Sequence, residues 1–377
     1  MAFAGFFSRG QYFFDVNLQY LFYVGLWPKE DFTRDKVILY KLYEVLLHIL
    51  SLIYVVTTSI GTYQNKQDIA IFLSNLDKTL VAYNFVLKVL VFVMKRKHVE
   101  KLIKEIEASG DRISNNQKRL MALHVIIITI VMTGIIGLFG LLALFKMEMI
   151  VEAWMPFDPH QNMTNYLMAT QILVISFTVP CSFRSIALQG IVCSIVLYLC
   201  EQFIDLQNRI KGLEYSKANE LLMRIEFKEI VKKHMRLIKF SKQLSTTFEE
   251  FFLIQNLAVS VEMCLNAMMV TMIDREQKTV LASFIAFLIL ALINAYIYCY
   301  LGNEMIIQSE GIAMAAYESS WTSWPLDMQK DLLIVIRVAQ KPLSLSAGGI
   351  VTMSMKAYSQ ALYNGYSIFA VLNDAVD

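Results

Sequence analysis

The chain has 377 residues, of which 56% are hydrophobic and only 18% are charged. A soluble domain keeps about a quarter of its residues charged, so this composition excludes an ordinary soluble protein and places the chain among membrane proteins. The formal net charge is +2 and no basic tract contains interleaved aromatic residues, which gives no support to nucleic-acid binding.

The residue types that bind metals or perform catalysis form no recognisable set in this sequence. The five cysteines lie in or beside apolar runs at no metal-like spacing, and we expect them to be buried small side chains: Cys181, Cys193, Cys200, Cys264 and Cys299. The five histidines form neither a ligand pair nor a triad-like set: His48, His98, His124, His160 and His234. We therefore expect no enzyme activity, no metal site and no cofactor.

Seven stretches are long enough and apolar enough to cross a bilayer. A bilayer core of about 30 Å needs roughly 20 apolar residues per helix. Residues Met1 to Trp27 lack the features of a cleavable signal, so the first span is expected to insert the protein. The predicted fold class is an all-α membrane protein with seven transmembrane helices, over Val37–Ile60, Ile69–Met94, Leu123–Phe145, Leu167–Cys200, Phe251–Ile273, Val280–Leu301 and Leu345–Leu372.

The distribution of Lys and Arg predicts the orientation of the chain in the membrane. With the N-terminus inside, the inner segments 1–36, 95–119, 201–247 and 302–343 hold 25 of these residues, whereas the outer segments hold 4. Positive residues concentrate on the cytosolic side of membrane proteins, so the N-terminus is expected to be cytosolic and the C-terminus extracellular. The sequon Asn162-Met163-Thr164 lies in the longest outer loop, where Asn162 is a candidate glycosylation site.

Two inner segments carry apolar residues at helical spacing among their charges. This pattern in 201–247 and 302–343 predicts cytosolic helices whose apolar stripes need packing partners, such as neighbouring subunits. The expected organisation is an N-terminal segment and a six-span bundle over 1–301, a cytosolic helical anchor over 302–343 together with 201–247, and a last helix with the C-terminus over 344–377.

The last predicted span carries a polar stripe on one face. At 3.6 residues per turn the stripe covers an arc of about 140° and comprises Thr352, Lys356, Ser359, Gln360, Tyr363, Asn364 and Ser367, with Val371 continuing it near the outer end. Polar groups on a spanning helix are expected to face protein or water. The stripe therefore predicts either hydrogen-bonded packing between helices or the lining of a pore that several subunits share.

The C-terminal part of the chain resembles the insect odorant receptors. The resemblance rests on the outer-loop motif Met155-Pro156-Phe157-Asp158 and on a run of later motifs: Tyr298-Cys299-Tyr300-Leu301-Gly302-Asn303-Glu304, Gln308-Ser309-Glu310, Tyr317-Glu318-Ser319, Trp321, Ala339-Gln340-Lys341-Pro342-Leu343, Ser346-Ala347-Gly348 and Gly365-Tyr366-Ser367-Ile368-Phe369. These motifs extend from about Pro156 to Leu372. The N-terminal part is similar mainly in length, hydropathy and topology.

This resemblance implies a tetrameric, non-selective cation channel in which each subunit contributes its last helix to a central pore. Tuned members of the family assemble with a common co-receptor subunit, and this chain is similar to the tuned kind because it lacks the co-receptor's long cytosolic insertion. The alignment of Ser367-Ile368-Phe369 with the family's terminal signature places the gate at Val371. The expected pore and gate residues are Val371, Ser367, Asn364, Gln360 and Lys356.

The resemblance also implies that a small volatile ligand binds in the outer half of the bundle. Such pockets are mostly apolar with one or two polar groups. We assign positions by the helix face that forms the pocket in the family, not by residue identity. The expected odorant-binding residues are Leu80, Tyr83, Asn84, Gly137, Leu141, Gln171, Val174, Thr178, Met268 and Met272. Ordinary helix packing is the alternative at each position. The ligand would open the channel by binding the open state more tightly than the closed one.

The implied partners are an odorant co-receptor, a small volatile ligand, membrane lipids and permeating cations, with no nucleic acid. The implied location is the plasma membrane, as a multi-pass protein of a sensory neuron dendrite. A gustatory-receptor-like channel and a seven-helix G-protein-coupled receptor are the alternatives, although no Asp-Arg-Tyr follows the third span and no Asn-Pro-x-x-Tyr ends the last one. A secondary transporter would show internal repeats, which this sequence lacks.

Overall fold

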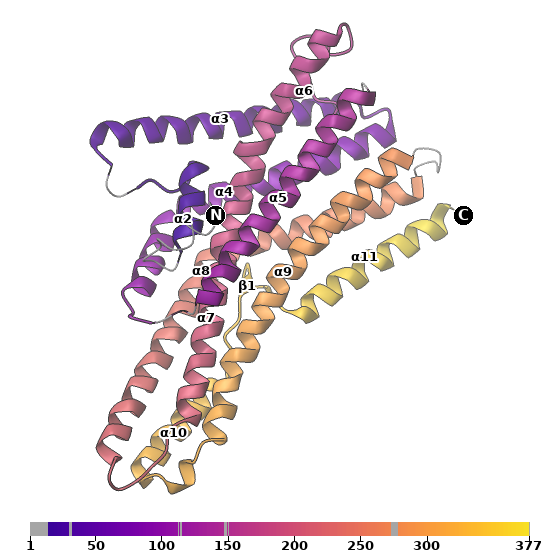
Figure 1. The fold of residues 1–377 in the computed structure, drawn as a ribbon. Helices are drawn as coiled ribbons and strands as arrows, with labels where there is room; N and C mark the ends of the chain where they lie inside the picture. The colour runs from indigo at the N-terminus through magenta and orange to yellow at the C-terminus, as the bar shows by residue number, and fades with distance from the viewer. Residues whose placement is uncertain are drawn as a thin grey trace.

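The computed structural model describes residues 14–29, 32–111, 113, 115–146, 149, 151–272 and 278–376. Its helices run in chain order as α2 (Asp15–Tyr23), α3 (Arg34–Gln64), α4 (Ile69–Glu107), α5 (Asn115–Lys146), α6 (Met163–Phe177), the π-helix η1 (Thr178–Phe183), α7 (Arg184–Lys211), α8 (Glu220–Met272), α9 (Lys278–Tyr317), the 3₁₀ turn η2 (Trp321–Ser323), α10 (Leu326–Ala339) and α11 (Met355–Val376). A short hairpin of β1 (Ser346–Ala347) and β2 (Val351–Thr352) precedes α11. The predicted all-helical fold is confirmed, and α3, α4, α5, α6–α7, α8, α9 and α11 correspond to the seven predicted spans (Figure 1).

Five of these helical segments are long and apolar enough, by length and composition, to cross a membrane. In the described residues they are Arg34–Gln64, Arg119–Gly137, Met163–Lys211, Glu220–Met269 and Leu288–Tyr317. Helices suit the bilayer interior because each satisfies its own backbone hydrogen bonds. The two remaining predicted spans, in α4 and α11, have more polar sequences: α4 contains Asp77, Lys78 and Lys88, and α11 contains the polar stripe.

The fourth predicted span forms the centre of the bundle. It runs as α6, η1 and α7, with η1 changing the helical pitch where Pro180 has no backbone N–H to donate. Nearly every residue from Arg184 to Phe203 is buried. Because α7 contacts α5, α8 and α9, it is the helix around which the others pack.

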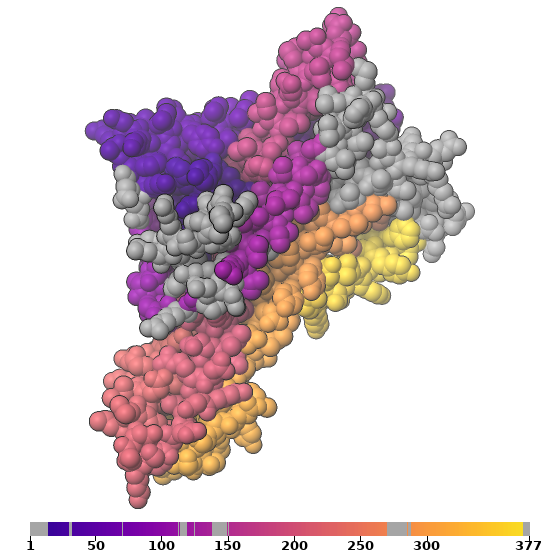
Figure 2. Space-filling model, in the orientation of Figure 1, coloured from indigo at the N-terminus to yellow at the C-terminus, as the bar shows by residue number. Residues whose placement is uncertain are grey.

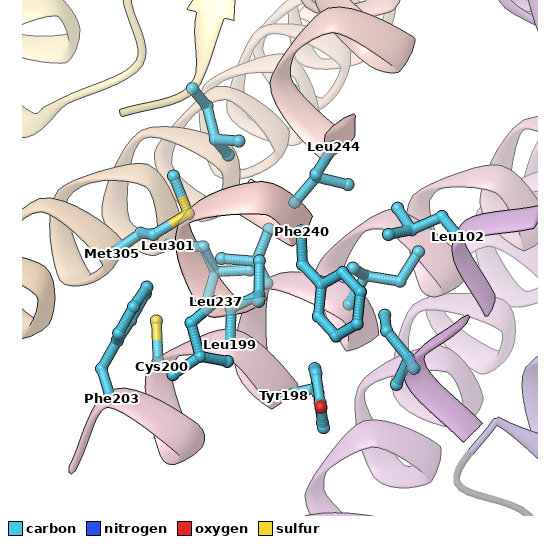
Figure 3. Packing of buried hydrophobic residues seen from close by; sticks show 14 of the residues in the cluster. Leu102, Tyr198, Leu199, Cys200, Phe203, Leu237, Phe240, Leu244, Leu301 and Met305 are labelled. Atoms are coloured by element: carbon cyan, nitrogen blue, oxygen red, sulfur yellow. The ribbon is translucent and has the colours of Figure 1, made fainter. Parts of the chain in front are cut away.

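The main hydrophobic core lies where α4, α7, α8 and α9 meet. Figure 3 shows Leu102 from α4, Tyr198 from α7 and Phe240 from α8 close together, with Phe203 from α7 nearer to Met305 from α9, and all are buried. Four of the five cysteines are buried and Cys264 is half-buried, and all five are free thiols. The prediction that the cysteines are small buried side chains is thereby confirmed for four of them.

At the bottom of the view in Figures 1 and 2, a narrow bundle is formed by α10, the C-terminal ends of α7 and α9, and the N-terminal end of α8. Helix α10 buries Met328, Leu332, Val335 and Ala339, one face at helical spacing. The ring of Trp324 packs edge-on against Phe227 at 5.8 Å between centroids. Arg224 Nη1 lies 2.5 Å from Asp327 Oδ2, and this contact lowers the pKa of the Asp327 carboxyl below its usual value.

The last span begins later than the sequence predicted. The expected start at Leu345 is wrong because Gly348 and Gly349 adopt positive φ angles of 60° and 71° and turn the chain into the β1–β2 hairpin. Thr352 therefore belongs to β2, paired with Ser346, and is not part of the helical stripe. The Gly348 N–H donates to the Glu249 carbonyl of α8 at 2.9 Å, so the hairpin fixes the point from which α11 diverges (Figure 1).

Candidate functional site

A cavity lies inside the helical bundle, between α4, α5, α6, α7, α8 and α9. The volume of this cavity is about 130 Å³. Its apolar wall includes Val81, Phe85, Ile136, Leu173, Phe177 and Ile186. A buried space with mostly apolar walls and a few polar groups is typical of sites for small ligands.

The polar part of the wall includes charged side chains from α4 and α8. Lys88 is 3% exposed; its ammonium donates to Gln255 Oε1 of α8 and lies 5.1 Å from the centre of the Phe251 ring. Glu262, two helical turns after Gln255, lines the same cavity and is 6% exposed. Charged groups within a membrane are costly unless they face one another or a wet space, so these residues fix the inward faces of α4 and α8.

Two amide side chains of the cavity wall carry buried atoms without a hydrogen-bond partner in the described part of the chain. They are Asn84 Oδ1 on α4 and Gln189 Nε2 on α7, and both residues are 7% exposed. A buried polar atom left unpaired costs about 1–3 kcal/mol. The cavity wall thus contains at least one unpaired acceptor and one unpaired donor among its buried atoms.

Of the predicted odorant-binding residues, Asn84 and Val174 line this cavity. Leu80 and Met268 pack instead against a small separate cluster formed by Leu73, Leu265 and Met269. The Tyr83 hydroxyl lies 3.0 Å from Ser59 Oγ of α3, and its side chain is partly exposed.

The other predicted pocket residues are not among the described residues that line the cavity. Gln171 is exposed on α6, and the Thr178 hydroxyl donates to the Val174 carbonyl at 2.6 Å. Among the described residues, no atom outside its own helix lies within 4 Å of the position a Cβ would take at Gly137. The side chains of Leu141 and Met272 lie outside the described residues.

Several polar wall residues were not predicted from the sequence. They are Lys78, Lys88, Gln189, Gln255 and Glu262. Lys78 also donates to Ser74 Oγ at 2.8 Å. The sequence contained a pattern that could have identified them. Polar residues inside a predicted span that are separated by whole helical turns, such as Gln255 and Glu262, lie on one face of the helix.

The polar stripe of α11 is exposed in the subunit. Lys356, Gln360 and Asn364 are exposed, and Gln360 Nε2 donates to Asn364 Oδ1 at 2.9 Å within the stripe itself. Ser367 is half-buried and donates to the Tyr363 carbonyl, whereas Val371 is 68% exposed. Helix α11 packs on α8 and α9 through a different face that includes Gly365. Intrasubunit packing therefore does not account for the stripe.

The sequon at the start of α6 is accessible. Asn162 is exposed and takes an extended conformation directly before the first residue of α6, Met163. Its glycosylation stays a prediction.

Comparison with known proteins identifies the family of this chain. A family model described as 7tm Odorant receptor matches residues 68–366. Odorant receptor 30a of Drosophila melanogaster is 29% identical over 44% of this chain and 43% of its own, and the odorant receptor coreceptor of Aedes aegypti is 26% identical over 42% of this chain and 33% of its own. The matched region thus spans less than half the length of these curated relatives.

A solved structure has the same fold. The insect olfactory receptor OR5 from Machilis hrabei, determined in complex with eugenol, superposes with a TM-score of 0.77 at 17% identity, over 96% of this chain and 97% of the other. Because the family match covers most of the chain and the fold agrees along its length, this protein is a multi-pass membrane receptor, not an enzyme, and it belongs to the insect odorant receptor family.

Proposed function

We propose that this chain is an odorant-tuned subunit of a heterotetrameric, ligand-gated, non-selective cation channel, opened by a small volatile molecule bound in the cavity. The observation that carries the proposal is the exposed polar stripe of α11, which no other helix of the subunit covers in the described residues. A polar face on a spanning helix needs water or another protein surface. A shared central pore supplies both.

The pore is formed by α11 from four subunits arranged around an axis. Gln360 and Asn364 line its wet part, together with Lys356 and Ser367. Val371, exposed toward the predicted extracellular end of the helix, forms an apolar ring that closes the pore by dewetting.

The cavity is linked to the pore helix through α8 and α9. Both helices contribute to the cavity wall, through Glu262 and Asn294, and both pack against α11. The contacts include Met263 of α8 against Gly365, and Tyr296 of α9 against Tyr358, with ring centroids 5.6 Å apart. A ligand that expands the cavity shifts these helices, and it favours the open state by its tighter binding there.

The partner of this subunit is a co-receptor of the same family, in the plasma membrane of a sensory neuron dendrite. Exposed apolar side chains at the cytosolic end provide surface for subunit contacts, since α8 and α10 expose Leu221, Leu222, Ile225, Leu333 and Ile334. A co-receptor among the relatives supports this assignment.

Electrophysiology of the chain expressed with and without a co-receptor tests the function. We expect odorant-evoked cation currents from a panel of volatiles when both subunits are present. A complete lack of ligand-gated current, despite normal surface expression of both subunits, contradicts the proposal.

Orientation is tested separately by glycosylation. We expect Asn162 to be modified and a sequon engineered near the N-terminus to remain unmodified, because the charge distribution places these segments on opposite sides. The reverse pattern contradicts the proposed topology.

A further inference from the structure

Two residues of the cavity wall carry a buried polar atom without a hydrogen-bond partner among the described residues, one an acceptor and one a donor. Asn84 on α4 and Gln189 on α7 are each more than nine-tenths buried, and these two helices pack against each other. Asn84 Oδ1 and Gln189 Nε2 have no partner among the described residues. Two other polar groups of the wall do have partners: the Lys88 ammonium contacts Gln255, and the Thr170 hydroxyl donates to the Tyr166 carbonyl.

A hydroxyl group is chemically complementary to both unpaired atoms. It donates one hydrogen bond, which suits Asn84 Oδ1, and it accepts others, which suits Gln189 Nε2. An aldehyde or ketone only accepts and leaves Asn84 Oδ1 unpaired, and an ether has the same defect. A hydrocarbon leaves both atoms unpaired.

The charges around the cavity favour a neutral ligand. The wall contains the ammonium groups of Lys78 and Lys88 and the carboxyl group of Glu262, while the Asp77 carboxyl lies beside Lys78 in sequence. Two basic and two acidic side chains are therefore present in this region. The apolar wall provided by Phe85, Leu173 and Ile186 suits a hydrocarbon body.

We propose that the cavity is selective for neutral alcohols or phenols with an apolar body, with the ligand hydroxyl bound between Asn84 Oδ1 and Gln189 Nε2. This assignment rests on the proposed function of the cavity as the ligand site and names the ligand class of that site. Asn84 and Gln189 determine selectivity for the head group, and the apolar wall selects the size and shape of the rest.

Isomeric ligand pairs isolate the contribution of the hydroxyl. Octanol and heptyl methyl ether are isomers, as are phenylethanol and benzyl methyl ether, so each pair differs in hydrogen bonding and little in size. We expect each alcohol to act at about tenfold lower concentration than its ether, as the loss of one buried hydrogen bond implies. The readout is the half-maximal concentration for current in cells that express the full chain with a co-receptor.

Two variants test the assigned side chains, and a third provides the control. Asn84→Leu and Gln189→Met keep the side-chain size and remove the amide, and each is expected to reduce the alcohol-to-ether preference to less than about threefold. Ser176→Ala removes a hydroxyl outside the cavity wall that already donates to the Ile172 carbonyl at 2.6 Å, so the preference should persist. Equal action of alcohols and ethers on the unmodified chain overturns the inference, as does a preference that survives both cavity variants.

A binding measurement separates this inference from the proposed channel function. Thermal unfolding of the purified full chain in detergent should shift upward more with each alcohol than with its ether, and Asn84→Leu should abolish the difference. If other volatiles open the channel but the chain does not distinguish alcohol from ether in either pair, only the ligand-class inference is overturned. If the chain passes no ligand-gated current but alcohols stabilise it more than ethers do, the channel function is overturned and the ligand-class inference is supported.

Discussion

Met263 of α8 packs directly against Gly365 of α11, so closely that a Cβ added at Gly365 would lie 2.1 Å from Met263 Cε. The residue before Met263 is Glu262, which lines the ligand cavity. One turn of α8 thus contacts the cavity on one side and the proposed pore helix on the other. In the proposed mechanism, a shift of α8 on ligand binding would reach α11 through this contact.

Gly365→Ala is expected to alter gating while the subunit still folds. The added methyl group must displace the flexible end of Met263, and overpacking of this kind costs about 1–3 kcal/mol. If the cost differs between the closed and open states, the half-maximal ligand concentration changes by up to about tenfold. Dose–response curves of the assembled channel measure this shift.

The double variant Gly365→Ala with Met263→Ala is the control. Removing the Met263 side chain makes room for the methyl group, so the double variant should return toward the response of Met263→Ala alone. Additive effects of the two changes would show that the two residues act independently.

Lys88→Met is expected to lower the stability of the subunit. It removes the donor to the buried Gln255 Oε1 and the favourable electrostatic effect of Lys88 on Glu262, and leaving a buried polar group unpaired costs about 1–3 kcal/mol. Adding Glu262→Gln should recover the electrostatic part of the loss. Surface expression and thermal unfolding in detergent measure both effects, and an equally large loss in the double variant contradicts the coupling.

Trp324→Ala is expected to loosen α10 from the end of α8. Trp324 is 3% exposed and packs on Phe227, and a buried Trp or Phe truncated to Ala typically costs about 3–5 kcal/mol. Leu326→Ala is the matched control, because Leu326 is 67% exposed on α10 and should change subunit stability by much less. Hydrogen exchange of the α10 amides distinguishes the two variants, and equal protection in both means that Trp324 does not hold α10 in place.

The sequence predicted the spans well because length and hydropathy alone determine which segments cross a bilayer. It predicted the cavity less well because helix faces in a membrane are difficult to distinguish, since lipid and protein interior are both apolar. In α4 the predicted pocket residues were Leu80, Tyr83 and Asn84. Of these, Asn84 lines the cavity, together with the unpredicted Val81, Phe85 and Lys88.

The start of the last helix was mispredicted for a local reason. Residues Leu345–Thr352 are apolar enough to continue a span, and the turn depends on the positive φ angles of Gly348 and Gly349. Glycine permits that conformation without requiring it. The hydrogen bond from Gly348 to the Glu249 carbonyl stabilises the hairpin, and this contact across 99 residues of sequence has no signature in a local pattern.

The exposed face of α11 is the feature on which the channel function depends most directly. Gln360, Asn364 and Val371 are exposed on this helix in the subunit. Replacing each with Cys, one at a time, and applying a membrane-impermeant thiol reagent during ligand stimulation measures whether water reaches them. We expect the modification to change the ligand-evoked current at all three positions, and to be faster in the open state for Gln360 and Asn364, which lie on the inner side of Val371. No modification at any of the three in either state, with the native cysteines replaced and surface expression intact, contradicts a pore lined by α11.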